Sequence, residues 1–387
     1  MLKKFKDVFL VLLKNGLNID SSDCSIIEDM SEEDARWLYR FSNSQDFAHI
    51  IAAALWRGGA LERFPELCEK FLRKWNLAHY RNARIESVYN RVCELLSLEK
   101  IDFLPLKGIV SKDLYPESWM RTSCDMDILV RKEDMERASC LLIDKLNFAK
   151  GEEGTHDLQL IYSGDTVLEL HYSLIEERYG KKSSYVLNDV WSNIIPTDSC
   201  KKSMTPEMFY FYHVAHMAKH FIMGGCGVRP FVDLYFMRNK DSELLSKSRD
   251  ILCEAGLYKF AQACEKIVDA WFCEGESGEE LRDVETYVIS GGIYGTMKNY
   301  SMVHAARAGG KYRFYLSRIW APYDDLVYTY PALREKRWLV PVYQIKRWFR
   351  LVFRGGIKKS TKARGFNADT KEQEKKMIAM LQNLELN

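Results

Sequence analysis

The stretch Met120–Val130, MRTSCDMDILV, decides the fold, because it sets two carboxylates two residues apart in an apolar, strand-like run. Successive side chains of a β-strand point to opposite faces, so Asp125 and Asp127 should share one face and their apolar neighbours the other. Two carboxylates this close repel, and each raises the pKa of the other unless a cation lies between them. Mg²⁺ prefers one or two carboxylates plus phosphate oxygens, so the pair predicts a site for such a cation.

The segment FLPLKG, upstream of the acidic pair, changes how that pair is interpreted. Taken alone, D-x-D marks a solvated acidic strand edge more often than a metal site. Phe103 to Leu106 predict a short buried strand, and Ile109 to Tyr115 predict a helix that starts directly after Gly108. A glycine at a strand-to-helix turn lets the backbone approach a ligand closely, and a helix N-terminus presents free N–H groups to phosphate. The segment therefore favours a phosphate site near the acidic pair.

A strand, a KG turn, a helix and then R-x-S-x-D-x-D on the next strand is the layout of a nucleotidyltransferase core. The sequence resembles the polymerase-β-like nucleotidyltransferase superfamily. It looks most like an uncharacterised bacterial nucleotidyltransferase family with a KG turn, a Y-P step, an Arg and D-x-D-x-hydrophobic in this order. The RTSCDMD segment is also similar to nucleotidyltransferases of the AbiEii type. Ile109 departs from the superfamily pattern, which usually has Gly or Ser after the turn glycine.

Two alternating stretches, HDLQLIY and TVLELHY, are separated by Ser163-Gly164-Asp165 and predict a β-hairpin. A two-residue loop would mix polar and apolar side chains on both faces. A three-residue loop pairs Gln159 with Glu169 and Asp157 with His171, and leaves the leucines on one apolar face. We therefore predict the three-residue loop, because it separates the two kinds of side chain.

The polar face of this hairpin provides a candidate third carboxylate. LELH resembles the family's acid-L-H element, and the resemblance implies that Glu169 completes the metal site. The alternative is an exposed strand glutamate. His171 could orient the substrate or accept a proton, or could simply be a neighbour of Glu169.

Thr205-Pro206-Glu207 predicts the start of a helix that carries His213, His216 and His220 on one face. Three ligands on one straight helix spread over about 10 Å, so all three cannot reach one ion, and we exclude a three-histidine metal site. H-x-x-K-H followed by GGCGVRPFVDL instead resembles the family's pattern of histidines, Gly, Arg and Asp.

The resemblance implies that Lys219 or Arg229 faces the triphosphate and that Asp233 positions Arg229, although an Arg–Asp pair of purely structural value fits the same residues. Arg121 could pair with either carboxylate of D-x-D when no metal is bound. The predicted catalytic and metal-binding residues are Asp125, Asp127 and Glu169, with Mg²⁺ or Mn²⁺ as the cation. The predicted nucleotide- and phosphate-binding residues are Lys107, Gly108, Ser111, Arg121, Ser123, Lys219, His220, Arg229 and Asp233.

Composition and charge bound the remaining interpretations. Ten cysteines among 387 residues form no C-x-x-C pair, which argues against a structural zinc site and a disulfide scaffold. The N-terminal run MLKKFKDVFLVLLKNGL predicts an amphipathic helix rather than a signal peptide, and no window reaches the ~18 apolar residues of a membrane span. Between Lys311 and Arg364 the chain carries a local charge of +11, whereas its net charge is only +2.

The predicted fold class is α+β: a polymerase-β-like nucleotidyltransferase core, built on a small mixed sheet, with helical regions before and after it. We expect an N-terminal helical region over residues 1–100, the core over 101–180 and a helical domain over 181–300. Residues 301–387 form a basic, aromatic C-terminal extension that resembles that of the family. A basic, aromatic helix near residues 338–354 predicts binding to RNA or an anionic membrane surface, unless it only packs on its own domain.

The function that the resemblance implies is metal-dependent transfer of a nucleoside monophosphate from an NTP to an acceptor hydroxyl or phosphate, by a two-metal mechanism. One alternative is an RNA-modifying (tRNA-type) nucleotidyltransferase or toxin, which the basic C-terminal arm favours. Another is a non-catalytic nucleotide-binding protein, which Ile109 at the turn favours. We expect a cytoplasmic protein, with association at the inner membrane surface as a second expectation. The acceptor stays open.

Overall fold

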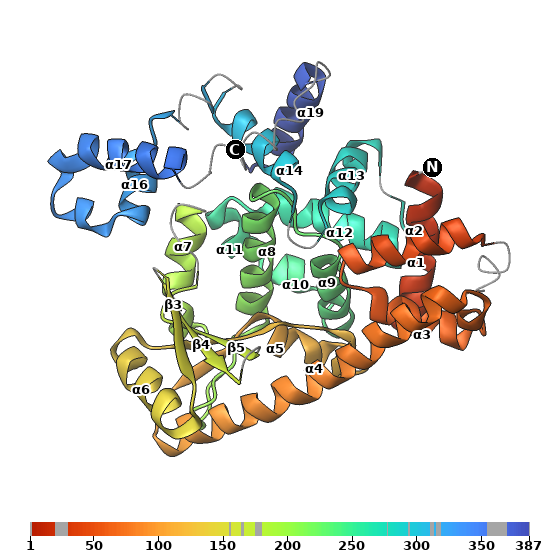
Figure 1. The fold of residues 1–387 in the computed structure, drawn as a ribbon, viewed down its shortest axis with the longest axis horizontal. Helices are drawn as coiled ribbons and strands as arrows, with labels where there is room; N and C mark the ends of the chain where they lie inside the picture. The colour runs from red at the N-terminus through yellow and green to blue at the C-terminus, as the bar shows by residue number, and fades with distance from the viewer. Residues whose placement is uncertain are drawn as a thin grey trace.

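The computed structural model describes residues 2–19, 30–154, 156–163, 166–174, 180–276, 278–292, 295–309, 313–314, 319–353 and 370–386. These residues form a five-stranded sheet with helices before it and after it in the chain (Figure 1). The protein is therefore a mixed α+β protein, as the sequence predicts. Among the described helices, none is both long and apolar enough to cross a membrane.

Two of the four α-helices described before the sheet begin at a capping serine or an N-terminal proline. The four are α1 (Leu2–Gly16), α2 (Glu32–Ser44), α3 (Ala48–Arg57) and α4 (Pro65–Leu98). Ser31 caps α2, because its hydroxyl accepts a hydrogen bond from the Asp34 N–H while the Asp34 carboxylate accepts one from the Ser31 N–H. Pro65 occupies the first position of α4, where a missing N–H does no harm. The long α4 runs from α3 to the sheet (Figure 1).

The sheet is mixed. Its strands are β1 (Phe103–Pro105), β2 (Asp125–Val130), β3 (Ala149–Glu153), β4 (Asp157–Tyr162) and β5 (Thr166–His171), in the spatial order β1-β2-β5-β4-β3. β2 and β5 are parallel, and every other neighbouring pair is antiparallel. The chain passes from β2 to β5 through α6 (Met135–Leu146), β3 and β4. The parallel pair at the centre of the sheet brings the acidic stretch of β2 beside the LELH stretch of β5.

The register of the β4–β5 hairpin is the one predicted for a three-residue loop. Gln159 pairs with Glu169, and Asp157 pairs with His171. Gly164 and Asp165, in the predicted turn, lie outside the described residues. The apolar face of the sheet packs on α4 and α6, and this core contains Val88, Val92, Ala138, Leu142, Met126, Ile128, Leu158, Leu160, Leu168 and Leu170. The opposite face carries the polar side chains.

Two local features differ from the predictions. The sequence does not predict β3, because most of this edge strand is exposed and its Lys and Glu side chains hide the alternation of a buried strand. The helix expected from Ile109 begins two residues earlier, as α5 (Lys107–Ser111), and a 3-10 turn follows it. Lys107, not Gly108, adopts the left-handed conformation at this turn, with φ 44°. The helix therefore starts at Lys107 and not at Ile109.

The helices after the sheet form the largest core together with α1–α3. They are α7 (Lys181–Asn188), α8 (Pro206–Ile222), α9 (Arg229–Lys240), α10 (Leu244–Lys247), α11 (Arg249–Ala255), α12 (Tyr258–Phe272), α13 (Arg282–Gly291), α14 (Met297–Arg307) and α19 (Thr370–Asn383). Thr205 caps α8, as predicted. Two further helices, α16 (Tyr323–Thr329) and α17 (Val340–Phe353), lie to one side of this helical body (Figure 1).

Gln45, which follows α2, links this helix to α13 and to the residue before α9. Its side chain is fully buried, donates to the Ile289 carbonyl at 2.8 Å and accepts from the Val228 N–H at 3.1 Å. We expect Gln45→Ala to leave both backbone groups unsatisfied and to lower the free energy of unfolding by about 3 kcal/mol. Urea unfolding followed by circular dichroism measures the change. Gln382→Ala, an exposed control on α19, should stay within about 0.5 kcal/mol of the wild type. Equal losses in the two variants would contradict the role given to Gln45.

Candidate functional site

The polar face of the central strands carries all three predicted carboxylates. Asp127 of β2 is the direct partner of Glu169 in the parallel β2–β5 ladder. Partners in such a ladder project from the same face, and Asp125, two residues before Asp127, projects from it too. Asp127 is almost fully buried, whereas Asp125 and Glu169 are half-buried. A carboxylate-rich face therefore lies on the side of the sheet opposite its apolar core.

The tightest group on this face consists of Asp127, Glu169 and His171. One ligand atom from each lies within 4.8 Å of the others, close enough to hold a metal ion. His171 donates from Nε2 to Asp127 Oδ1 at 2.9 Å, and the same nitrogen lies 3.5 Å from Glu169 Oε2. Asp125 is outside this group, and its Oδ1 accepts a hydrogen bond from the Ser123 hydroxyl at 2.9 Å. The tightest group thus contains His171 of β5, whereas Asp125 lies on the same face outside it.

Lys107 neutralises Asp127. Its ammonium lies 2.6 Å from Asp127 Oδ1, and the Asp127 side chain is only 3% exposed. Burial favours the neutral form of Asp127, but the Lys107 charge and the His171 hydrogen bond outweigh it and hold the pKa of Asp127 well below its usual range. Burial also favours the neutral form of Lys107 and so lowers its pKa. The Asp127 charge raises this pKa by more, so the net shift is upward. The two groups form a charged pair at neutral pH.

Mutual repulsion does not raise the pKa of both carboxylates. Burial, and then the Asp127 charge, raise the pKa of Asp125, as expected for like charges. The pKa of Asp127 moves in the opposite direction, because Lys107 supplies the cation between the pair. The repulsion expected between two carboxylates without a cation therefore acts on Asp125, whereas Lys107 offsets it at Asp127.

His171 contacts both carboxylates of the group. Burial alone lowers the pKa of its imidazole, but the hydrogen bonds to Asp127 and Glu169 raise it overall. Since a carboxylate only accepts hydrogen bonds, His171 carries a proton on Nε2. Its Nδ1 is buried and has no hydrogen-bond partner among the described residues. The ring is thus held by one nitrogen, and its second nitrogen remains available for a proton or a ligand.

Gly108 is required by close packing in the turn. A Cβ at this position would lie 3.0 Å from the Ser123 hydroxyl oxygen, 3.2 Å from Ser123 Cβ and 3.7 Å from Arg121 Nη1. Any larger side chain would therefore push on Ser123, which is hydrogen-bonded to Asp125. Ser111, the last residue of α5, is buried below this turn. The KG turn is packed directly on the residues that precede the D-x-D strand.

Arg121 and Asp233 form a buried pair, which differs from the predicted pairing. Arg121 donates from Nε and Nη2 to the two oxygens of Asp233, at 2.8 and 2.9 Å, and Tyr115 donates to the same carboxylate at 2.7 Å. The alternative pairing of Arg121 with Asp125 or Asp127 does not occur. Asp233 also does not position Arg229. The sequence misses this pairing because the partners are 112 residues apart.

Arg229 is instead positioned by Asp46. Its Nη1 lies 3.1 Å from Asp46 Oδ2 and 3.3 Å from the Thr122 carbonyl, and the Thr122 hydroxyl donates to the same Asp46 oxygen at 2.7 Å. Asp46 precedes α3 in a left-handed conformation with φ 58°. Asp46, in the turn between α2 and α3, and Thr122, just before β2, therefore hold Arg229, and nothing in the sequence around Asp46 indicates this role.

Helix α8 brings a second set of polar side chains to the sheet. His220 and His216 share a hydrogen bond of 3.2 Å between their Nε2 atoms, whereas His213 bonds to the Pro230 carbonyl, so the three histidines do not converge. Burial, followed by the nearby Lys219, lowers the pKa of His220 to about 4. Burial and the His220 ring depress the pKa of His216 as well. Both imidazoles are therefore neutral at pH 7.

Tyr212 of α8 is a residue near the carboxylate cluster that the sequence analysis misses. Burial raises its pKa, the Lys107 charge opposes this shift, and the Asp127 and Glu169 charges add to it, so its hydroxyl lies within electrostatic range of the cluster. This hydroxyl is buried and has no hydrogen-bond partner among the described residues. Tyr212 precedes His216 by four residues on α8, and this helical spacing could have revealed it.

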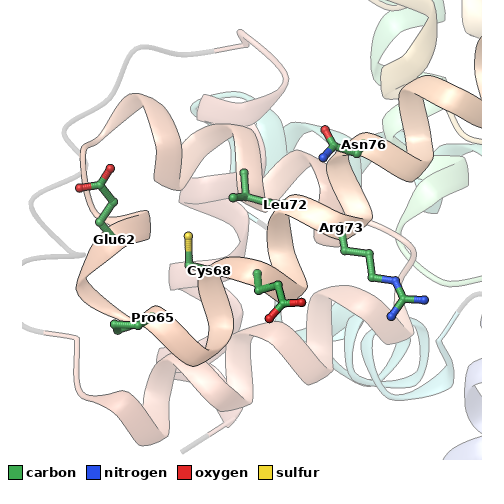
Figure 2. A pocket seen from close by; sticks show the side chains of 7 residues that line it. Glu62, Pro65, Cys68, Leu72, Arg73 and Asn76 are labelled. Atoms are coloured by element: carbon green, nitrogen blue, oxygen red, sulfur yellow. The ribbon is translucent and has the colours of Figure 1, made fainter.

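The larger cavities lie away from the carboxylates. A cavity of about 750 Å³ is lined by residues such as Ile109 and Lys201, and one of about 670 Å³ follows the first turns of α4 (Figure 2). Figure 2 shows that Cys68 and Leu72 line the latter. None of the predicted site residues lines either cavity. A smaller cavity, of about 290 Å³, is lined by Lys219 together with Lys182 and Arg307.

One comparison with known proteins identifies a relationship. The model of a family described as "Uncharacterised nucleotidyltransferase" matches residues 31–272, well over half of the chain. The matched range contains the whole sheet, α5 and α8. The search of curated proteins and the search of solved structures each found no match.

Repulsion between the carboxylates alone would make Asp127→Asn stabilising, but the Lys107–Asp127 pair predicts that this substitution is destabilising. We expect Asp127→Asn to lower the free energy of unfolding of the metal-free protein by about 2 kcal/mol at pH 7, because the partly buried Lys107 ammonium loses its counter-charge. The effect should shrink as the pH falls below about 4, because stability from a carboxylate with a lowered pKa is present above its unfolded-state pKa and lost in acid. Chemical unfolding in EDTA measures it.

Glu169→Gln is the matched control, because the Glu169 side chain is 28% exposed and lies farther from a cation. It should change the free energy of unfolding by less than about 1 kcal/mol. If Asp127→Asn unfolds at the same or a higher denaturant concentration than the wild type, repulsion dominates and the ion pair contributes nothing.

Proposed function

Because the chain belongs to an uncharacterised nucleotidyltransferase family, we propose that it transfers a nucleoside monophosphate from an NTP to an acceptor hydroxyl or phosphate. The observation that carries the proposal is the parallel pairing of β2 with β5, which sets Asp127 beside Glu169 on the face that also bears Asp125. In this proposal residues 101–180 form a polymerase-β-like core. Residues 1–100 and 181–300 form the helical regions, and residues 301–387 form the C-terminal extension.

The donor set fits a divalent cation. Asp127 and Glu169 offer oxygen ligands within 4.8 Å of one another, and Asp125 adds a third carboxylate on the same face. Hard cations such as Mg²⁺ and Mn²⁺ prefer such oxygen ligands. Bound there, one or two such ions would stabilise the charge of an in-line phosphoryl displacement. The raised pKa of Asp125 fits a role in cation binding, because a cation would relieve the repulsion between neighbouring carboxylates.

The chain's own residues would then bind and orient the substrate. Lys107 and Lys219 would offset phosphate charge, and the small cavity lined by Lys219, Lys182 and Arg307 concentrates two further cations beside α8. The Ser123 hydroxyl holds the Asp125 carboxylate, and Gly108 makes room for that contact. His171 would hold or accept a proton at its free Nδ1. The Tyr212 hydroxyl would donate to the substrate.

Four of the predicted phosphate-binding residues would act indirectly. Arg121 and Arg229 are paired with Asp233 and Asp46, which lie outside the carboxylate cluster, so these pairs would shape the site rather than bind phosphate. Lys107 differs because it pairs with Asp127 inside the cluster, where a bound cation would displace it toward the phosphates. His220 would act as a neutral hydrogen-bonding partner of His216. We therefore assign these four residues a positioning role. We assign the binding of the phosphates to Lys107 and Lys219.

Transfer of labelled phosphate tests the proposal directly. The protein is incubated with Mg²⁺, a cell extract and each NTP labelled at either the α- or the γ-phosphate. We expect the α-label to appear in a product and the γ-label to appear in pyrophosphate. Glu169→Gln should reduce product formation at least about 100-fold, because it removes a ligand of the reacting centre. Glu152→Gln, an exposed glutamate on the same sheet, is the matched control and should keep full activity.

The same experiment separates the competing functions. Loss of the product on treatment with ribonuclease identifies RNA as the acceptor. Binding of NTP without release of pyrophosphate would identify a non-catalytic nucleotide-binding protein and contradict the proposal. Transfer of the γ-label would identify a kinase and contradict it as well.

A further inference from the structure

Residues 319–350 contain a small packed unit with α16 and α17 as its helices (Figure 1). Its own core consists of Ala321, Leu326 and Leu333, and Val340 and Tyr343 of α17 pack against this core. The side of α17 that carries Val340 and Tyr343 therefore faces this core, and the opposite side of the helix faces away from it.

The inner side of α17 contains a polar residue. Gln344 is fully buried, donates to the Ala321 carbonyl at 2.7 Å and accepts from the Ala321 N–H at 3.3 Å. Both ends of its amide are therefore satisfied by one backbone position, which fixes how the helix is rotated about its axis.

The outer side of α17 carries a stripe of large apolar side chains, which we call the outer stripe. It consists of Val342, Ile345 and Phe349 of α17 and of Trp338 in the 3-10 turn Arg337–Leu339 just before it, at intervals of four, three and four residues, the spacing of one helical face. The exposed fractions of Trp338, Val342, Ile345 and Phe349 are 76%, 56%, 49% and 59%. An ordinary surface helix turns such residues inward, and a contiguous exposed apolar face marks an interaction surface.

Neighbouring aromatic residues enlarge the outer stripe. Trp348 donates to the Ile319 carbonyl at 2.6 Å, and its ring lies 6.1 Å from that of Trp320. Of the thirteen large apolar side chains that are exposed among the described residues, seven lie between Ile319 and Phe349. The exposure is therefore a property of this unit rather than of the surface as a whole.

Cations flank the outer stripe. Lys346 Nζ and Arg350 Cζ lie 5.7 and 5.8 Å from the centre of the Tyr330 ring, which fixes them beside the stripe. Neither forms an ion pair with a carboxylate among the described residues. The sequence that follows α17 adds five Lys or Arg and no acid between Arg354 and Arg364. An anionic surface would complement this charge.

We propose that the outer stripe of α17 docks on an anionic phospholipid bilayer, with the helix lying parallel to the membrane surface. An interfacial helix buries Trp, Phe and aliphatic side chains among the headgroups while flanking Lys and Arg contact anionic lipids. α17 has 14 residues, so it is about 21 Å long at 1.5 Å per residue and shorter than the ~30 Å hydrocarbon core. The proposal does not depend on nucleotidyl transfer.

The outer stripe favours lipid over RNA and over a second copy of the chain. Phosphate backbones require cations at the centre of the contact and bases require aromatic planes, whereas the aliphatic Val342 and Ile345 occupy the centre of the stripe. Self-association through the stripes would bring Lys346 and Arg350 of both copies together and leave their charges uncompensated. An anionic bilayer can bury the apolar side chains of the outer stripe and also pair with the flanking cations.

Vesicle flotation of the full-length protein tests the proposal. We expect the protein to float with vesicles of phosphatidylcholine and phosphatidylglycerol at low salt, and to bind vesicles of phosphatidylcholine alone far more weakly. Replacing Val342, Ile345 and Phe349 together by Ser should reduce binding at least about tenfold. The matched control replaces Leu98, Ile195 and Met297 by Ser, since these residues are comparably exposed elsewhere, and should bind as the wild type does.

The thermal midpoints of both triple variants should equal that of the wild type, because every altered side chain is exposed. The proposal is overturned if the intact protein binds no anionic vesicle at low salt, or if the two triple variants lose binding equally. It is also overturned if the stripe variant loses only RNA binding, or if it converts a dimer of the wild type into a monomer without affecting vesicle binding.

Discussion

The burial of the Asp127 carboxylate constrains the whole site, because a buried charge must be paired. Lys107 supplies the counter-charge at 2.6 Å, and His171 supplies a hydrogen bond to the same oxygen. Lys107 reaches this position because the chain turns through a left-handed residue directly after β1. The tight packing of Gly108 on Ser123 then fixes the turn against the D-x-D strand. A cation that binds Asp127 would have to compete with an ammonium already there.

The site lies where three parts of the chain meet. The sheet supplies the carboxylates, α8 supplies the histidines and Tyr212, and the loop before α3 supplies Asp46, which holds Arg229. The buried Arg121–Asp233 pair joins the segment before β2 to α9. These ion pairs cross between elements far apart in sequence, and the Arg121–Asp233 pair links the helical body to the segment that leads into the sheet. Leu104 of β1 and Leu129 of β2 also belong to the apolar core of the helical body, so both kinds of contact hold the sheet against it.

Local patterns in the sequence predict the elements, but not the pairings between them. Alternation along β4 and β5 suffices to predict their register, because a shift of one residue would bury Glu169 and expose the leucines. The exposed β3 lacks such alternation and escapes prediction. The partners of Arg121 and Arg229 cannot be predicted, because an Arg can pair with any acid that folding brings near it, and both partners are more than 100 residues away in sequence. The outer stripe of α17 requires the structure for the same reason, since only packing shows which apolar face is covered.

Crystallography with Mn²⁺ in place of Mg²⁺ tests the central claim, that the carboxylates of β2 and β5 hold a divalent cation. Crystals grown with Mn²⁺ and a non-hydrolysable NTP analogue would be measured at a wavelength where manganese scatters anomalously. We expect an anomalous peak about 2.2 Å from carboxylate oxygens of Asp127 and of Glu169 or Asp125, with the Lys107 ammonium displaced toward the phosphates. An intact Lys107–Asp127 pair with no peak on this face, or a peak elsewhere in the molecule, would contradict the assignment.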